Sequence, residues 1–301
     1  MLIDGNEITI SGKFIKMAQF KEDWDIDVEN PEQVIVKLKE SGTKADLFTF
    51  IQRLPESKPK FNYYMEWDNY AAIPIKNYDY WSKKQVSQNS RKKIGLAKRK
   101  GVEIRICVFN DDFVKEQLQI YHETPIRQNI PNNAYNFTFE QAKKANATFL
   151  DRAIFLGAYF ENELIGFLKI VDARKFARTM GIIGKVAHRD KAPMNLLVAK
   201  AVEICAENKF PYLTYGNYDF GKLGSSTLKE FKRNLGFENI IFPRYFIPLT
   251  IKGRLALIFK LHHRFVQLLP LKFVRFLLFL RRKWYERKYA EYIRKEDTYT
   301  S

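Results

Sequence analysis

One stretch of the 301-residue sequence limits the possible folds more than any other: IFLGAYFENELIGFLKIV, from Ile154 to Val171. Two apolar runs of strand length flank the polar triplet Glu161-Asn162-Glu163, and this pattern predicts a β-hairpin. A third expected strand, Arg178–His188, follows, and then a helix, Pro193–Glu207, with proline at its first position. A strand, a helix and a strand are expected next: Tyr212–Tyr215, Thr227–Leu235 and Ile240–Pro248. This order predicts an α+β fold, in which helices flank one mixed central sheet.

The first hundred residues also mix strands and helices. Apolar alternation predicts three strands, and amphipathic spacing predicts two helices. In chain order these are Glu7–Ile15 (strand), Pro31–Glu40 (helix), Ala45–Gln52 and Phe61–Ile75 (strands), and Tyr80–Gly101 (a basic helix). Val102–Val108 is a further expected strand, and Asp111–Glu123 a helix with an aspartate cap. We therefore expect three consecutive parts: an α/β region (1–101), a core domain (102–250) and a helical tail (251–301).

The net charge of +17 is concentrated in two segments. Trp81–Arg105 holds nine Lys or Arg residues and one acid, and Ile251–Ser301 holds thirteen and four. Such basic regions favour polyanionic partners such as anionic lipid, phosphates or RNA. The alternative for the first region is a solvated helix face.

The cysteines and histidines predict neither a disulfide framework nor a metal site. Cys107 and Cys205 are the only cysteines, and they form no C-x-x-C pair. The four histidines have no HExxH-type spacing: His122, His188, His262 and His263. This usage fits a reducing compartment, and the N-terminal residues MLIDGNEITI do not resemble a signal peptide. We therefore expect a cytoplasmic protein.

Three segments resemble the GCN5-related N-acetyltransferase (GNAT) superfamily: IFLGAYFENELIGFLKIV, HRDKAPMNLLVAKAVEICAENKFPYLTYGNY and SSTLKEFKRNLGFE. Within them, APMNLLVAKAVEICAE and LKEFKRNLGF are more similar to the Fem-type branch. Fem-type enzymes add amino acids from aminoacyl-tRNA to peptidoglycan precursors, and they carry two GNAT-like domains in tandem. The resemblance covers roughly Val102–Thr250. It implies a GNAT-like acyltransferase core, and it leaves open whether 1–101 is a shortened first GNAT-like unit.

The expected donor site departs from the GNAT pattern. GNAT enzymes that use acyl-CoA seat its pyrophosphate on an R/Q-x-x-G-x-G/A loop, whose backbone amides face the phosphates. In this sequence Ala192 and Met194 replace the small positions, and Pro193 lacks an amide hydrogen. Arg189 and Lys191 are the candidate donor-binding residues. We expect no permanently bound cofactor, and the co-substrate is either acyl-CoA or aminoacyl-tRNA.

The helix Thr227–Leu235 carries the leading catalytic candidate. Thr227 and Glu230 form a predicted capping box, and Gly236 is the expected stop. For Lys232 the resemblance implies that it holds the acyl carbonyl or substrate phosphates, where a cation stabilises an oxyanion. Lys229 and Arg233 lie on the same side by spacing and are candidate substrate-binding residues. The alternative is that all three form a solvated face.

Other candidates lie in loops and strands. Asp219 is a candidate base or a turn-former, and the preceding Asn217 and Tyr218 are candidate substrate contacts at a strand end. Glu123 is a third catalytic candidate in the loop YHETPIRQNIPNNAY, where Arg127 has the chemistry to clamp a carboxylate or phosphate.

That loop is an ordinary surface loop in the alternative interpretation. Lys169 and Arg244 interrupt apolar strands and are either substrate contacts or residues on a solvated edge. His188 is either a base or a cap beside Arg189.

The tail predicts two helices, Lys252–Leu269 and Leu271–Lys295, separated by Pro270. In the second, basic residues and large apolar residues occupy different sides, which is typical of an interfacial membrane helix. Charges recur too often for a transmembrane span. The alternative is a helix packed on the core or on a dimer partner.

Together these features predict an N-acyltransferase acting on an amine of a cell-envelope sugar or peptide precursor. Its partners would be a phosphate-bearing donor, an amine acceptor and, through 251–301, an anionic membrane surface at the inner face. One alternative is an aminoacyl-tRNA-dependent Fem-like ligase. Another is a non-catalytic scaffold that binds RNA through Trp81–Arg105. In that scaffold, nearby aromatic residues would stack on bases or form core: Tyr63, Tyr64, Trp67, Tyr78, Tyr80 and Trp81.

Overall fold

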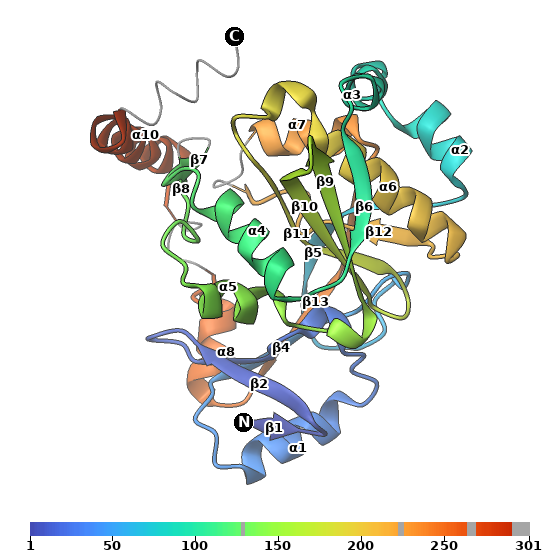
Figure 1. The fold of residues 1–301 in the computed structure, drawn as a ribbon. Helices are drawn as coiled ribbons and strands as arrows, with labels where there is room; N and C mark the ends of the chain where they lie inside the picture. The colour runs from blue at the N-terminus through green and yellow to red at the C-terminus, as the bar shows by residue number, and fades with distance from the viewer. Residues whose placement is uncertain (128–129, 222–225, 264–268, 291–301) are drawn as a thin grey trace. The chain divides into compact units, whose positions relative to one another are not determined.

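The computed structural model describes residues 1–127, 130–221, 226–263 and 269–290 (Figure 1). The chain forms two compact units, each built from segments that are separate in sequence. The first unit comprises Met1–Tyr70, Asp219–Leu223 and Asn239–Leu271, and the second comprises Ala71–Tyr218, Gly224–Glu238 and Lys272–Ser301. The sequence predicted three consecutive domains, and whether those parts fold independently stays a prediction.

The second unit is built on a mixed sheet whose strands follow the order β5-β12-β11-β10-β9-β6. β11 and β12 are parallel, and the other neighbours are antiparallel. The strands are β5 (Tyr64–Pro74, of which residues 71–74 belong to this unit), β6 (Glu103–Cys107), β9 (Ala153–Phe160), β10 (Glu163–Asp172), β11 (Ala177–Gly184) and β12 (Tyr212–Thr214). A small second sheet pairs β7 (Ile126–Arg127) with β8 (Ile130–Pro131).

The predicted hairpin is confirmed as β9 and β10. Glu161 and Asn162 join them with φ of 50° and 64°, the left-handed conformations that a tight two-residue hairpin turn requires. Side chains of β9 alternate between two apolar clusters, because successive residues of a strand point to opposite faces. Leu156 packs with α6 (Pro193–Glu207), whereas Phe155 packs with α4 (Asp111–Tyr121).

Helices cover both faces of this sheet, as predicted (Figure 1). α6 has the predicted bounds and buries most of its length in the core. The remaining helices of the unit are α2 (Tyr78–Tyr80), α3 (Gln88–Arg99), α5 (Phe139–Asn146), α7 (Ser226–Asn234) and α10 (Leu271–Lys288).

The prediction of a single basic helix over Tyr80–Gly101 is wrong, because the segment is divided into shorter helical pieces. A π-helical turn follows α2, Val86 is extended, and Ser87 then caps α3 by accepting a hydrogen bond from the amide of Ser90. Trp81 anchors the turn before the break, because it is fully buried and its indole N–H donates to the carbonyl of Leu235 at 2.9 Å. The same burial rules out Trp81 as a base-stacking platform.

Two predicted helix caps are also wrong. Asn110, not an aspartate, caps α4: its side chain accepts from the amide of Phe113. α7 begins at Ser226, so Thr227 lies inside the helix and does not form the predicted capping box. The predicted stop is confirmed, since Gly236 has a φ of 84° and ends the helix.

The first unit contains the strand order β1-β2-β3-β4-β13-β5. β3 and β4 are parallel, and the pairs β1/β2, β2/β3 and β4/β13 are antiparallel. Among the described residues its strands and α-helices are β1 (Leu2–Ile3), β2 (Asn6–Ser11), β3 (Met17–Phe20), β4 (Leu47–Ile51), β13 (Glu238–Pro248), α1 (Pro31–Glu40) and α8 (Ile251–Ile258). Stacked aromatic rings, including Phe48, Phe50 and Tyr245, form much of its core.

α8 packs into the first unit, as in the alternative of a tail helix packed on the core. Ala256 and Leu257 are buried with Leu47 and Phe246. Gly253 is required there, because a Cβ at this position would lie 1.9 Å from the carbonyl oxygen of Asp46. The helix ends at Ile258 rather than continuing to Leu269. Residues 264–268 and 291–301 of the predicted tail lie outside the described residues.

A helix that crosses a bilayer needs about 20 mostly apolar residues. In the described ranges, with gaps at 128–129, 222–225, 264–268 and 291–301, no helix combines the length and the apolar character needed to cross a membrane.

Candidate active site

Lys232 occupies the point where the chain leaves the sheet of the second unit. β12 ends at Thr214, and the ammonium of Lys232 donates hydrogen bonds to the next carbonyls, those of Tyr215 at 2.9 Å and Asn217 at 2.7 Å. It also lies 4.5 Å from the centroid of the Tyr215 ring. Lys232 is only 1% exposed, so the solvated-face alternative is wrong for this residue.

Burial changes the proton affinity of this lysine. Desolvation disfavours the charged form and lowers the pKa of Lys232 to about 8. Burial likewise raises the pKa of the Tyr215 phenol to about 12. Tyr215 was missed by the sequence analysis, because nothing in its spacing marks it. A lysine of this kind can donate to a developing oxyanion and can exchange a proton near neutral pH.

The residues around Lys232 form a small basic and aromatic group. The ammonium of Lys229 lies 5.5 Å from the centroid of the Tyr218 ring, so both lysines of α7 reach the segment that follows β12. Arg233 is exposed on the same helix. The structure therefore brings together Lys232, Lys229, Asn217 and Tyr218, with Lys232 inside and Lys229 at the surface.

Asp219 forms a turn in the first unit. Its carboxylate accepts from the amide of Gly221 at 2.9 Å, and its own amide donates to the side chain of Asn69 at 2.8 Å. This geometry fits the turn-forming alternative.

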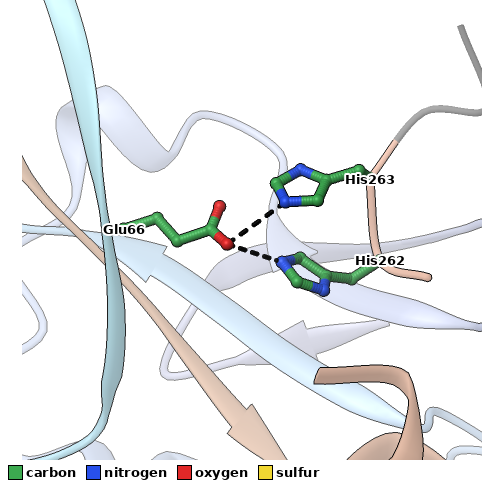
Figure 2. A group of neighbouring side chains, drawn as sticks. All are labelled: Glu66, His262 and His263. Carbon is green, nitrogen blue, oxygen red and sulfur yellow. Dashed lines mark hydrogen bonds and ion pairs between the residues drawn. The ribbon is translucent and has the colours of Figure 1, made fainter. Parts of the chain in front are cut away.

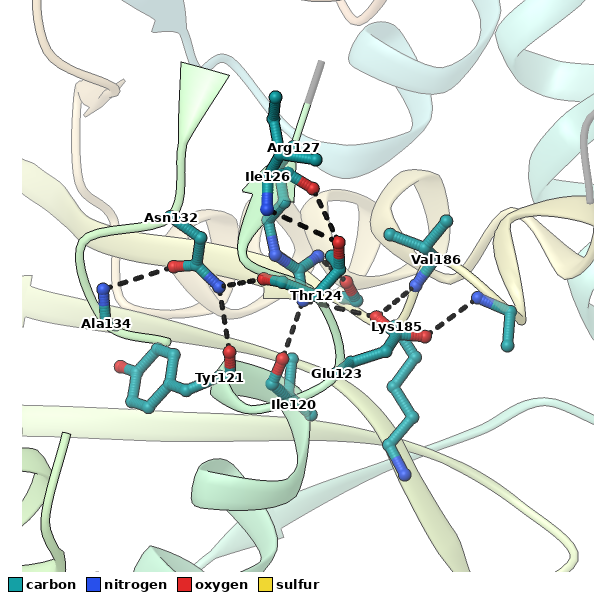
Figure 3. Close-up of polar contacts among 12 residues, drawn as sticks. Ile120, Tyr121, Glu123, Thr124, Ile126, Arg127, Asn132, Ala134, Lys185 and Val186 are labelled. Atoms are coloured by element: carbon teal, nitrogen blue, oxygen red, sulfur yellow. Dashed lines mark hydrogen bonds and ion pairs between the residues drawn. The ribbon is translucent and has the colours of Figure 1, made fainter. Parts of the chain in front are cut away.

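Glu123 and Arg127 are joined to the loop that precedes α6 (Figure 3). The carboxylate of Glu123 accepts from the amides of Val186 at 2.6 Å and Ala187 at 2.9 Å. Arg127 donates to Glu123 at 3.2 Å and to the carbonyl of Gly184 at 2.6 Å. These two residues anchor the loop, so the ordinary-surface-loop alternative does not describe them.

Lys169 and Arg244 are engaged in structural contacts. Lys169 is buried, and its ammonium donates to the carbonyl of Asn146 at 2.8 Å and the hydroxyl of Thr148 at 2.9 Å, beyond the end of α5. Arg244, in the first unit, pairs with Asp23 at 3.0 Å and Asp68 at 2.8 Å. The solvated-edge alternative is therefore wrong for Lys169.

The remaining candidates lie near the start of α6. His188 pairs with Glu163 at 3.2 Å. Arg189 is exposed. The ammonium of Lys191 lies 3.5 Å from the carboxylate of Asp190 and 4.7 Å from the centroid of the Phe160 ring.

The comparisons with known proteins find similarity in structure but not in sequence. No family model matches the sequence, and no curated protein matches it. The structure is similar to that of FemX, with a TM-score of 0.59 at 10% identity over 84% of this chain and 86% of that one. It is also similar to L-PGS from Bacillus licheniformis, with a TM-score of 0.55 at 13% identity over 86% of each chain. The C-terminal domain of a putative lysylphosphatidylglycerol synthetase from Agrobacterium fabrum gives 0.54 at 15% identity over 83% of each chain.

The chain shares its fold with these solved structures.

The loop before α6 contains the segment 189–194, where a pyrophosphate cradle was expected, and backbone amides of this loop already have acceptors. Val186 and Ala187 donate to Glu123. Arg189, Lys191 and Ala192 donate to carbonyls within the loop at 3.1 Å. Ala192 is left-handed, with a φ of 51°, and Pro193 begins the helix. Five amides of the loop are thus bonded within the chain, which disfavours their use by a phosphate.

Proposed function

We propose that this chain is an N-acyltransferase acting on an amine of a cell-envelope precursor, with aminoacyl-tRNA rather than acyl-CoA as its donor. The observation that carries the choice of donor lies in the segment 189–194, where the pyrophosphate loop was expected: the amides of Lys191 and Ala192 already donate to the carbonyls of His188 and Arg189 at 3.1 Å. The likeness to FemX and to lysylphosphatidylglycerol synthetase supports the same choice.

The surface of α3 supports a nucleic-acid donor. Its sequence, QNSRKKIGLAKR, contains no acid, and all five of its cationic residues are exposed: Arg91, Lys92, Lys93, Lys98 and Arg99. One of them, Arg91, also has a structural role, since its guanidinium donates to the carbonyls of Lys83 at 3.0 Å and Val86 at 2.8 Å. An acid-free helix face of this kind is suited to the phosphates of tRNA, because each neutralised phosphate releases counterions.

The proposed reaction places Lys232 beside the donor ester. The acceptor amine attacks the ester carbonyl, a C–N bond forms and the carbonyl oxygen becomes an oxyanion. Lys232 donates a hydrogen bond to that oxygen. The C–O bond to the ribose then breaks, and the proton lost by the amine passes to the ribose oxygen, which leaves as a hydroxyl. Positioning of the two substrates supplies the rest of the rate enhancement.

Binding measurements test the donor. Acetyl-CoA should bind with a dissociation constant on the order of 1 mM or weaker, about −4 kcal/mol, because the amides of the loop are already bonded. Charged tRNA should bind much more tightly, and its affinity should fall steeply as salt rises. Isothermal calorimetry with both ligands measures this.

Tighter binding of acetyl-CoA than of charged tRNA would contradict the proposal. Micromolar binding of acetyl-CoA, with no binding of tRNA, would make simple acyl transfer from CoA the better function. Binding of tRNA without transfer of its amino acid to any envelope amine would leave the scaffold function.

We also propose that α10 binds an anionic membrane surface. Val274 is buried, whereas the predicted apolar side is exposed: Phe273, Phe276, Leu277, Leu280 and Trp284 are 42–54% accessible. The helix carries seven Lys or Arg residues and one acid. A wide exposed apolar face combined with net positive charge is the pattern of a helix that lies in a lipid interface.

The double variant Phe276→Asp with Leu280→Asp should bind vesicles containing phosphatidylglycerol at least tenfold more weakly. Each apolar side chain contributes roughly 2 kcal/mol when it leaves water, and each added carboxylate is repelled by the surface. Vesicle sedimentation measures this, and Phe14→Asp, at an exposed position of the first unit, is the matched control. Equal sedimentation of the double variant and the wild type would exclude α10 as the anchor.

A further inference from the structure

Two neighbouring histidines and a glutamate converge in the first unit (Figure 2). Glu66 lies on β5, and His262 and His263 follow the end of α8. One carboxylate oxygen of Glu66 lies 3.0 Å from Nε2 of His262 and 3.2 Å from Nε2 of His263. All three ligand atoms lie within 4.8 Å of one another.

The backbone after α8 sets up this arrangement. Lys260 is left-handed, with a φ of 55°, and turns the chain so that the amide of Leu261 donates to the carbonyl of Ala256 at 2.8 Å. The side chain of His262 is 1% exposed and packs against the rings of Tyr64 and Phe246. The position of the first histidine is therefore fixed by the fold.

The contacts of His262 direct its Nε2 toward Glu66. Nδ1 of His262 lies 3.4 Å from the carbonyl oxygen of Ala256, and Nε2 lies 3.0 Å from the carboxylate oxygen of Glu66. A carboxylate oxygen can only accept, so a ring N–H or a metal ion joins these two atoms. The hydroxyl of Tyr64 donates to the same carboxylate oxygen at 3.0 Å and orients it.

We propose that Glu66, His262 and His263 bind a divalent transition-metal ion of the Zn²⁺ class. Two imidazole nitrogens and one carboxylate oxygen suit Zn²⁺ and disfavour Mg²⁺ and Ca²⁺, which prefer oxygen ligands. Metal–ligand bonds of about 2.0 Å in a tetrahedron place ligand atoms about 3.3 Å apart, close to the two Glu66–histidine distances. Glu66 and His263 are 27% and 26% exposed, so water can reach a fourth position.

Metal uptake by the untagged full-length chain tests this site. After treatment with a chelator and dialysis, Zn²⁺ should bind with one-to-one stoichiometry and a dissociation constant on the order of 1 μM or tighter by calorimetry. Co²⁺ at the same site should give the visible absorption of tetrahedral coordination. Zn²⁺ should also raise the thermal midpoint of the chain.

Variants assign the uptake to these residues. His263→Ala should weaken Zn²⁺ binding by on the order of 100-fold, and Glu66→Gln keeps the side-chain size while lowering affinity at least tenfold. His122→Ala, at an exposed position in the second unit, is the matched control and should bind as the wild type does. Absence of stoichiometric uptake by the wild type would overturn the proposal in favour of a proton shared between His262 and Glu66. Unchanged affinity in both site variants would also overturn it.

Discussion

Replacing Lys232 with methionine is expected to lower turnover at least tenfold while the chain stays folded. Methionine keeps the length and the apolar contacts of the side chain but removes the ammonium that binds the carbonyls of Tyr215 and Asn217. The loss follows because one donor to an oxyanion commonly accounts for a factor of 100 or so in rate. Transfer from charged tRNA to an envelope amine measures it, and Lys13→Met, at an exposed position, is the control.

The same variant also tests whether the charge of Lys232 is buried, through the pH dependence of the free energy of unfolding. The pKa of Lys232 is about 8 in the folded chain, below the ordinary lysine value of 10.5. Between these values the unfolded chain binds more protons than the folded chain, so the free energy of unfolding rises with pH. The wild type should therefore gain about 2 kcal/mol relative to Lys232→Met between pH 7 and pH 9.5. Urea unfolding at both values measures this difference, and an unchanged difference would show that Lys232 is not desolvated.

Replacing Glu123 with glutamine is expected to lower the free energy of unfolding by about 3 kcal/mol. The carboxylate serves two backbone amides and the guanidinium of Arg127, and its side chain is 19% exposed. An amide in its place satisfies fewer of these donors and leaves the arginine charge without its partner. Denaturant unfolding measures the change.

Glu207→Gln is the matched control for that variant, because Glu207 is exposed at the end of α6. A surface substitution of this kind should stay within about 0.5 kcal/mol of the wild type. If Glu123→Gln is equally mild, the loop before α6 is held by contacts other than those of Glu123.

Local signals in the sequence predicted the core of the second unit well. The hairpin over β9 and β10, the bounds of α6 and the stop at Gly236 each depend on residues that are neighbours in the chain. Turn chemistry, proline at the first helical position and glycine after the last one act over a few residues, so they can be identified in the sequence.

Features that depend on distant partners could not be predicted in this way. The turn before α3 is anchored by the hydrogen bond of Trp81 to Leu235, 154 residues away. The role of Glu123 follows from contacts with Val186, 63 residues on. Spacing on α7 placed Lys232 beside Arg233 on one side, but only the carbonyls after β12 explain why Lys232 turns inward.

The strand order of the first unit has a consequence for how the chain is made on the ribosome. β4, with the sequence LFTFI, is buried along its whole length, and its antiparallel partner is β13. Gln52, just after β4, and Tyr245 of β13 are 193 residues apart in the chain. At about 5–20 residues per second, translation leaves that edge of β4 without its partner for roughly 10–40 s. An apolar strand exposed for so long is a template for wrong pairing, so we expect that protection of β4 until β13 emerges favours correct folding of the nascent chain.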